Sequence, residues 1–419
     1  MTGGRHAPGA SIGLREFGGT TTEAAIGIGS HQLVGVGSTT KVMTATMVMQ
    51  HVEEGAIRLD DPVVGYLEAL ENEPWASTVT VRHLLTHTSG IDCGDDFTDT
   101  GIGADSVARF VECCVVGSRT LHPPGAHWSY NNCGFILLGR ILEVLEEASW
   151  EEVLLDRVVG PLGLGMTTTT LLDESSDWVM GHRIDSESGE MVEEPRFMAK
   201  AGGPAGSNLM GTARDLLDFA EGLIGPDPTL LSPDSAQEMT RPQFSDSIQG
   251  QGLAWWIPSA GHVSHPGSTR GTSAYLHVKP STWALAVVAN GPGAHTIGER
   301  VLREVWGGEI TEAGRELPTA VGIGVDIDTV PGIYDRRHVS HELRAQNGDL
   351  YAHTRYKGAV ADFFDDPPPV RLQSVGDGVF ESEGRHDSSD GLWEFVEVDE
   401  DGRPLLLRAG NRLHRRRAG

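Results

Sequence analysis

The chain has 419 residues and a mass of 44.9 kDa, enough for one large domain and a smaller one. Its formal net charge of -27 argues against nucleic acid as a partner. No apolar run approaches the ~20 residues of a membrane span, and the first residues show no export signal, so we expect a cytoplasmic protein that has no membrane partner. The four cysteines are expected to remain thiols there, and their spacing predicts no metal site.

The first half of the chain predicts a β-hairpin followed by helices. Residues 10–28 alternate apolar and polar side chains around Gly18 and Gly19, which is typical of a hairpin. From Ser38 an apolar run without alternation extends to Gly55 and predicts a buried helix begun by a hydroxyl residue. Further helices are expected over residues 81–86, 106–113, 133–146, 150–159 and 212–224, the last begun by a Thr-x-x-Asp capping box.

The second half returns to β patterns. Residues 252–257, 274–278 and 283–289 predict strands, and residues 293–305 predict a helix that packs on their sheet. We assign residues 1–310 to a catalytic domain, 311–329 to a linker, and 330–419 to a small β domain with turns at residues 377–378 and 401–402. The basic residues 412–417 are expected to form a solvated terminus and no binding motif.

Ser38 and Lys41 form a Ser-x-x-Lys pair at the start of the predicted helix. Lys41 is the only lysine that has a serine three residues before it. Residues at i and i+3 share a helix face, so both side chains are expected in one cleft, with Ser38 at the positive end of the helix dipole. A lysine shielded from water has a lowered pKa, and its neutral amine could take the serine proton. The alternative is a helix cap at Ser38 and a surface charge at Lys41.

A second candidate motif is Tyr130 and Asn132, in the Pro- and Gly-marked loop HPPGAHWSYNN. Tyr130 could pass a proton from Ser38 to the leaving group. The Asn132 amide could contact Lys41 and donate to a substrate carbonyl. Taken alone, these residues are better explained as an aromatic core anchor beside a helix-capping Asn.

A third motif is His265-Pro266-Gly267, followed by Ser268. A glycine at position 267 would let a substrate lie against the edge of a strand. The backbone N–H of Ser268 could join that of Ser38 in an oxyanion hole. A lone histidine is more often a surface or core residue, so the order of the three motifs carries the argument.

Ser-x-x-Lys, Tyr-x-Asn and His-x-Gly, in this order and near these spacings, resemble the motifs of the serine β-lactamase and DD-peptidase superfamily. The closest resemblance is to its class C β-lactamase-like branch, supported by VRHLLTHTSGI, LLGRILEVL and GTARDLLDF. The resemblance covers residues 8–306 and implies an α/β (α+β) fold, an antiparallel sheet flanked by helices, with an acyl-enzyme mechanism. It implies that Ser38 is the nucleophile, Lys41 the base and Tyr130 the proton relay. By the same resemblance, Asn132 contacts the substrate and His265 is the residue of the third motif.

The third motif departs from the Lys-Thr-Gly that is usual in this superfamily, where the lysine attracts the substrate carboxylate. His265 is only partly charged near neutral pH, so strong recognition of a β-lactam carboxylate is not expected. The His-x-Gly form is similar to that of D-aminopeptidases, whose relatives include esterases and transacylases. The residues from position 330, with PGIYDRR and GNRLHRR, resemble a small lipocalin-like antiparallel β domain that follows some of these enzymes.

We therefore expect a serine hydrolase that acts through an acyl-enzyme on a small-molecule ester, amide or peptide, D-amino-acid amides included. One alternative is an acyltransferase of secondary metabolism that passes the acyl group to an amine or alcohol. Another is a non-catalytic sensor of the penicillin-binding type. No metal or organic cofactor is expected, and the oligomeric state is left open.

Three other patterns compete for the site. Ser11 lies in a Gly-x-Ser-x-Gly sequence, but the strand and helix that a nucleophile elbow needs are not expected around it. His83 and His87 could share a helix face as metal ligands, although Leu84 stands where the zincin motif has Glu. Cys133 follows Asn132 and is interpreted as a small core residue.

Overall fold

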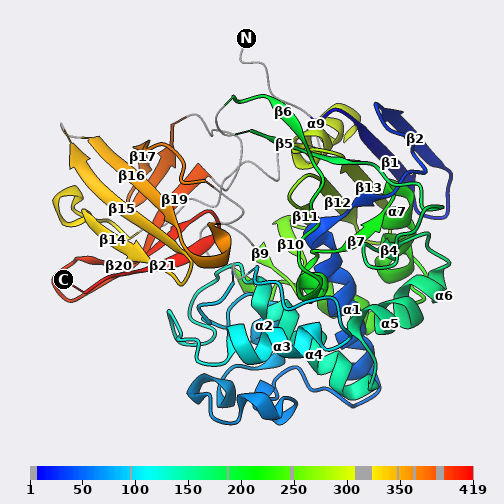
Figure 1. The fold of residues 1–419 in the computed structure, drawn as a ribbon, viewed down its shortest axis with the longest axis horizontal. Coiled ribbons are helices and arrows are strands. Elements are labelled where there is room, and N and C mark those ends of the chain that lie inside the picture. Colours follow the sequence, from blue (N-terminus) through cyan, green and yellow to red (C-terminus); the bar gives the residue numbers. More distant parts are fainter. Residues whose placement is uncertain are drawn as a thin grey trace.

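The computed structural model describes residues 7–94, 97–185, 188–245, 250–306, 323–346, 349–361, 365–383 and 391–418. A mixed helix-and-sheet domain and a β-barrel lie beside each other (Figure 1). This arrangement confirms the expected fold class. The predicted linker lies largely outside the described residues, so the bounds 1–310, 311–329 and 330–419 stay predictions.

The large domain is built on one eight-stranded antiparallel sheet in the order β2-β1-β13-β12-β11-β10-β9-β8. The predicted hairpin is confirmed, and its first strand pairs with β13, so strands from both ends of the domain meet in the sheet. The strands are β1 Ala10–Glu16, β2 Thr21–Ile26, β8 Phe244–Ser245, β9 Gly250–Gln251, β10 Trp256–Ser259, β11 His262–Ser268, β12 Ser273–Lys279 and β13 Trp283–Ala289.

The expected strand at residues 252–257 is wrong over most of its length. Leu253, Ala254 and Trp255 are fully buried, yet they connect β9 to β10. Ala254 has a positive φ of 65°, and its N–H donates to the Leu85 carbonyl outside the sheet. The apolar run therefore reflects burial in the core, which periodicity alone does not distinguish from a strand.

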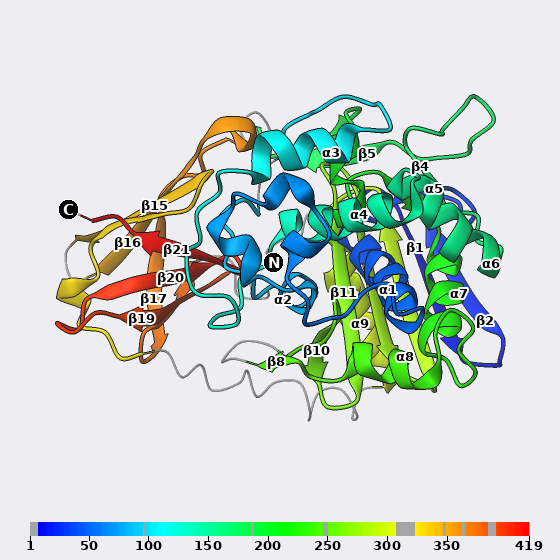
Figure 2. The same cartoon turned by 90° about the horizontal axis from the view of Figure 1, so that it is seen from below.

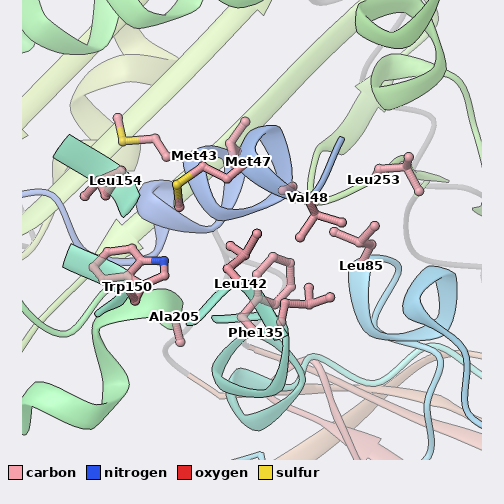
Figure 3. Packing of buried hydrophobic residues seen from close by; sticks show 14 of the residues in the cluster. Met43, Met47, Val48, Leu85, Phe135, Leu142, Trp150, Leu154, Ala205 and Leu253 are labelled. Atoms are coloured by element: carbon pink, nitrogen blue, oxygen red, sulfur yellow. The ribbon is translucent and has the colours of Figure 1, made fainter. Parts of the chain in front are cut away.

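Helices cover both faces of the sheet. Alternate residues of β12 and β13 point to opposite sides, as strand geometry requires. Ala274, Leu276 and Ala286 join the main core together with side chains of α1 (Thr40–Glu53), α4 (Asn132–Glu146) and α7 (Ala213–Ile224), whereas Tyr275 and Leu285 pack against α9 (Ala294–Trp306) on the other face. Figure 3 shows part of this core, in which Met43 and Met47 of α1 gather with Leu142 of α4 and Trp150 of α5 (Trp150–Leu154).

Seven helices lie at predicted positions: α1 Thr40–Glu53, α2 Val81–Leu85, α3 Ser106–Phe110, α4 Asn132–Glu146, α5 Trp150–Leu154, α7 Ala213–Ile224 and α9 Ala294–Trp306. Two more, α6 Gly160–Leu162 and α8 Pro233–Thr240, were not predicted. The capping box of Thr212 and Asp215 at the start of α7 is confirmed. The stretches after α3 and α5 continue as π-helical turns, Val111–Val115 and Leu155–Val159. Two small sheets complete the domain, with β3 Val34–Gly35, β4 Thr167–Thr168 and β7 Leu209–Gly211 in one and β5 Gly181–Ile184 and β6 Met191–Glu194 in the other.

The C-terminal part is a closed barrel of eight strands joined in sequence order, an up-and-down arrangement shared with lipocalins. The turns predicted at residues 377–378 and 401–402 are confirmed, with Gly378 and Gly402 both at positive φ. The strands are β14 Gly332–Asp335, β15 Val339–Gln346, β16 Asp349–Tyr356, β17 Val370–Gly376, β18 Val379–Ser382, β19 Leu392–Val398, β20 Pro404–Ala409 and β21 Arg412–Arg416.

The prediction that residues 412–417 form a solvated terminus is wrong. Residues 412–416 form β21, which pairs with β20 and with β14 and so closes the barrel. Leu413 packs with Leu121 of the large domain, and the next residue, His414, is fully buried near His341 of the barrel. Leu413 and His414, on opposite faces of the strand, are therefore both covered, which a count of the strand's charges does not reveal.

The barrel docks on the large domain through backbone and side-chain hydrogen bonds. The Leu413 N–H donates to Ser129 Oγ at 3.1 Å, and Arg415 donates to the Leu121 carbonyl at 2.7 Å. The Tyr130 N–H donates to the Asn411 carbonyl at 3.0 Å. Figure 2 shows the adjoining ends of β20 and β21 pointing toward the helices of the large domain. The second sequence motif is thus held by the barrel.

Candidate active site

Ser38 lies in a tight turn just before α1. The 3-10 turn Gly37–Thr39 runs directly into the helix, and the Ser38 side chain remains partly exposed. Gly37 has a positive φ of 57°, and a Cβ atom there would lie 2.4 Å from the backbone nitrogen of Ser268. Only glycine fits at this position, because β11 crosses directly against the turn.

Lys41 is fully buried one turn further along and points back to the serine. Its Nζ lies within hydrogen-bond distance of Ser38 Oγ, at 3.1 Å, and donates to the Ala205 carbonyl at 2.5 Å. Burial, and secondarily the positive charge of Arg412, hold the pKa of Lys41 well below its usual range. A neutral amine has a lone pair that can accept the hydroxyl proton of Ser38, so the alternative of a surface charge is wrong.

Tyr130 lies next to this pair. Lys41 Nζ is 4.9 Å from the centre of the Tyr130 ring, and the Arg412 guanidinium carbon is 5.0 Å from the same centre. His87, at a positive φ of 57°, stacks obliquely on the ring at 4.5 Å and accepts a hydrogen bond from the Asn131 N–H. The backbone of the second motif is therefore fixed on both sides of Tyr130.

Asn132 begins α4 and lines the same pocket as Ser38 and Tyr130. The preceding Asn131 provides the cap, because its side chain accepts from the Gly134 N–H at 3.1 Å. The Asn132 amide is thereby left for the pocket. Its expected contact with Lys41 stays a prediction.

The third motif lies on strand β11. A Cβ atom at Gly267 would lie 2.0 Å from the Val36 carbonyl oxygen and 3.1 Å from the Ser38 nitrogen. This close approach brings Gly267 and Ser268 to the edge of the nucleophile turn, and both residues line the pocket with Ser38. The oxyanion hole formed by the two serine N–H groups stays a prediction that this placement favours.

His265 is fully buried, and it is absent from the side chains that line the pocket among the described residues. Burial, followed by the charge of Lys41, lowers the pKa of His265 to about 3, so the ring is neutral at pH 7. Its Nδ1 lies 2.7 Å from the Pro266 carbonyl, which makes Nδ1 the protonated nitrogen. A direct catalytic role for His265 stays a prediction, and its position beneath Trp256 and Tyr130 suits support of those rings.

The pocket has a volume of about 380 Å³ and collects residues from both domains. Sequence reasoning missed Asn411 and Arg412, which stand at the tip of the β20–β21 hairpin. Gly410 and Asn411 have φ values of 56° and 63°, which is the geometry of a two-residue type I′ turn, and the Gly-Asn pair was the available signal. Other lining residues that were missed are Phe97, Ile136, Met198, Trp256 and Arg270.

The competing sites do not form. Ser11 is buried within β1 opposite Val288, so no nucleophile elbow exists there. His83 caps α2 in a reciprocal box with Thr80, and the described residues contain no group of three metal-ligating side chains. Cys133 is fully buried and donates to the Cys93 carbonyl, in agreement with its interpretation as a core residue.

Comparison with known proteins agrees with this geometry. A family model described as Beta-lactamase matches residues 1–305. The chain belongs to the beta-lactamase family. Within this family, penicillin-binding protein 4 of Amycolatopsis lactamdurans is 33% identical over 368 residues, covering 79% of this chain and 94% of that protein. Acyltransferase calJ of Penicillium decumbens is 28% identical over 261 residues, covering 55% and 62% respectively.

Solved structures share the beta-lactamase fold. The structure of SurE aligns with a TM-score of 0.75 at 24% identity and covers 98% of this chain and 95% of its own, so the likeness includes the barrel. A D-stereospecific amidohydrolase from Streptomyces sp. aligns with a TM-score of 0.60 at 26% identity, over 72% of this chain and 94% of its own. In the described part of this chain, no helix is long and apolar enough to cross a membrane.

Proposed function

We propose that this chain is a serine acyl hydrolase that forms an acyl-enzyme on Ser38. The observation that carries the proposal is the buried Lys41 amine 3.1 Å from Ser38 Oγ, with its pKa held well below the usual range by burial and by Arg412. Burial disfavours the charged form of this amine, so its lone pair is more readily available to act as a general base than that of an exposed lysine.

The reaction runs in two stages. Lys41 takes the proton of Ser38 as Oγ attacks the substrate carbonyl, and the N–H groups of Ser38 and Ser268 donate to the oxygen that becomes negative. Lys41 then gives this proton up through Tyr130, which passes it to the departing amine or alcohol, and the carbonyl carbon remains bonded to Oγ. A water molecule then attacks this ester, with the same base taking its proton, and the free acid leaves.

The substrate we propose is the ester or amide of a small molecule, with D-amino-acid amides and peptides as the first class to examine. Likeness to the D-stereospecific amidohydrolase supports this class. Likeness to acyltransferase calJ supports the second candidate, in which an amine or alcohol accepts the acyl group in place of water. The neutral His265 makes this pocket a poor site for recognising a β-lactam carboxylate through the third motif.

The test is brief exposure to p-nitrophenyl acetate, followed by intact-mass analysis, peptide mapping and measurement of nitrophenol release. We expect an acetyl group on Ser38 and continuing turnover, both lost in Ser38→Ala. Ser11→Ala is the matched control, since Ser11 is a buried strand residue and its loss should leave labelling intact. Stoichiometric labelling without turnover would favour the sensor, and turnover in Ser38→Ala equal to the wild type would refute the assignment. Adding amine acceptors then separates transfer from hydrolysis.

A further inference from the structure

His87 is a buried residue to which the proposed reaction gives no role. It follows helix α2, Val81–Leu85, at a positive φ of 57°, and it is 1% exposed. Its ring centre lies 4.5 Å from that of Tyr130 and 5.1 Å from that of Phe135. A positive φ is strained for most side chains and favours glycine, so a histidine at this position is best explained by what its side chain contacts.

His87 accepts the backbone N–H groups on both sides of Tyr130. Its carbonyl accepts from the Ser129 N–H at 2.9 Å, and its Nδ1 accepts from the Asn131 N–H at 3.0 Å. The Tyr130 N–H between them donates to the Asn411 carbonyl at 3.0 Å. Two of these three consecutive hydrogen bonds therefore end on one residue, and the bond from Asn131 needs a side-chain acceptor that glycine would not provide.

The hydrogen bond from Asn131 requires a neutral imidazole, because a protonated Nδ1 cannot accept. Burial, and after it the electrostatic effects of Lys41, His265 and Arg412, hold the pKa of His87 well below its usual range. When Lys41 becomes protonated during acylation, its charge opposes protonation of His87 still more. Nδ1 therefore keeps its lone pair for Asn131 throughout the step.

Proton transfer to the leaving group depends on the place of Tyr130. In the proposed reaction Tyr130 gives its hydroxyl proton to the departing oxygen or nitrogen and takes the proton that Lys41 received from Ser38, so its own protonation is restored. Lys41 is held by its hydrogen bond to the Ala205 carbonyl. A displacement of about 1 Å between reacting groups costs on the order of a hundredfold in rate, so Tyr130 must be held equally well.

We propose that His87 is a positioning residue that holds Tyr130 in place for proton transfer to the leaving group. Nδ1 fixes the backbone after Tyr130, the carbonyl of His87 fixes the backbone before it, and the imidazole ring supports the phenol ring. His87 acts through Tyr130 in this assignment. The inference deepens the proposed function and rests on it for the role of Tyr130.

The kinetic test compares phenyl acetate with p-nitrophenyl acetate. p-Nitrophenolate departs readily as an anion, whereas phenolate is more basic and gains more from a proton supplied by Tyr130. The leaving-group ratio is kcat/KM for phenyl acetate divided by kcat/KM for p-nitrophenyl acetate. His87→Phe keeps an aromatic ring but removes the acceptor, and it should lower this ratio about tenfold or more, because the proton donor is misplaced.

His87→Asn is the rescue variant. Asparagine carries an acceptor, Oδ1, as many bonds from the backbone as Nδ1 of histidine and tolerates a positive φ, so the leaving-group ratio should stay within a few-fold of the wild type. An equal loss for both esters in His87→Phe, the mark of a merely structural role, would overturn the proposal. A ratio in His87→Asn as low as in His87→Phe would also overturn it.

His277→Phe is the matched control. His277 is also 1% exposed, its Nδ1 is bonded to the Tyr275 hydroxyl at 2.9 Å, and its ring stacks on Trp283 in the cluster beside α9. Its replacement should leave the leaving-group ratio unchanged. Thermal unfolding checks each variant, and should His87→Phe fail to fold, His87→Gly decides, because glycine adopts this φ without strain. An unchanged ratio in His87→Gly would overturn the proposal.

Tyr130→Phe separates this inference from the proposed function. It removes the proton donor and should lower the leaving-group ratio at least as much as His87→Phe does. Because His87 acts through Tyr130, His87→Phe should lower the ratio no further in the Tyr130→Phe background. A ratio unchanged in Tyr130→Phe would refute the relay of the proposed function and this inference with it. A ratio lowered in Tyr130→Phe but not in His87→Phe would overturn this inference alone.

Hydrogen exchange tests the hydrogen bond to His87 without a substrate. In His87→Phe the Asn131 N–H loses its acceptor and should exchange about tenfold faster than in the wild type, whereas His87→Asn should keep it protected. Unchanged exchange in His87→Phe would overturn the proposal even if esters are hydrolysed. Faster exchange confined to the segment around Tyr130 would support the positioning contact even if no ester is turned over.

Discussion

Gly267 lies where strand β11 crosses the turn that carries Ser38, and its replacement by alanine gives a sharp test of the site. The new methyl carbon would stand 2.0 Å from the Val36 carbonyl oxygen. Atoms in favourable contact lie about 3.5 Å apart, so strand and turn must separate by more than about 1 Å. A displacement of about 1 Å at reacting atoms costs on the order of a hundredfold in rate. We expect Gly267→Ala to lower kcat/KM for p-nitrophenyl acetate by about that factor.

The assay for Gly267→Ala pairs nitrophenol release with thermal unfolding, because the same separation also weakens packing. Gly65→Ala, in the same domain, is the control, because no atom lies within 4 Å of the added methyl. Its activity and melting temperature should stay near those of the wild type. Activity of Gly267→Ala within a few-fold of the wild type, with an unchanged melting temperature, would mean that the close approach of β11 to Ser38 is not needed for catalysis.

Three further predictions address the base, its charge and the barrel. Lys41→Met should slow Ser38 acylation by about 10²- to 10⁴-fold in stopped-flow measurements, and a smaller loss would assign the base elsewhere. The wild-type kcat/KM should fall as the pH drops through the pKa of Lys41. Arg412→Leu should move this acid limb of the pH profile to higher pH, because the charge of Arg412 lowers the pKa of Lys41. An acid limb that does not move would contradict this effect of Arg412. Glu394→Gln should destabilise the barrel by about 3–5 kcal/mol in urea unfolding, because it removes the carboxylate that lies 2.6 Å from the buried Arg408. Glu397→Gln changes a more exposed carboxylate and should cost far less.

Local patterns were sufficient to predict most elements of the catalytic domain. The helix after Ser38 and the capping box at Thr212 are encoded by residues within a few positions of one another, and both are confirmed. The run at residues 252–257 was misassigned because Trp255 is buried by tertiary contacts that periodicity does not report. A buried position favours an apolar side chain, but it does not determine the conformation of the backbone.

The candidate site was predictable only in its catalytic-domain half. Ser38 and Lys41 are three residues apart on one helical turn, so their contact follows from local geometry. Arg412 reaches the same pocket through the barrel topology, and a basic C-terminal run gives no sign of this by itself. The neutrality of His265 was likewise hidden, because it depends on full burial beside Lys41.

The position of Arg412 couples the base to the charge of the substrate. Burial is the larger cause of the lowered pKa of Lys41, so the catalytic domain alone favours a neutral amine. Arg412 adds a smaller contribution in the same direction, which comes from its positive charge. A carboxylate bound beside Arg412 would offset that charge and raise the pKa of Lys41, whereas an apolar substrate would leave it low.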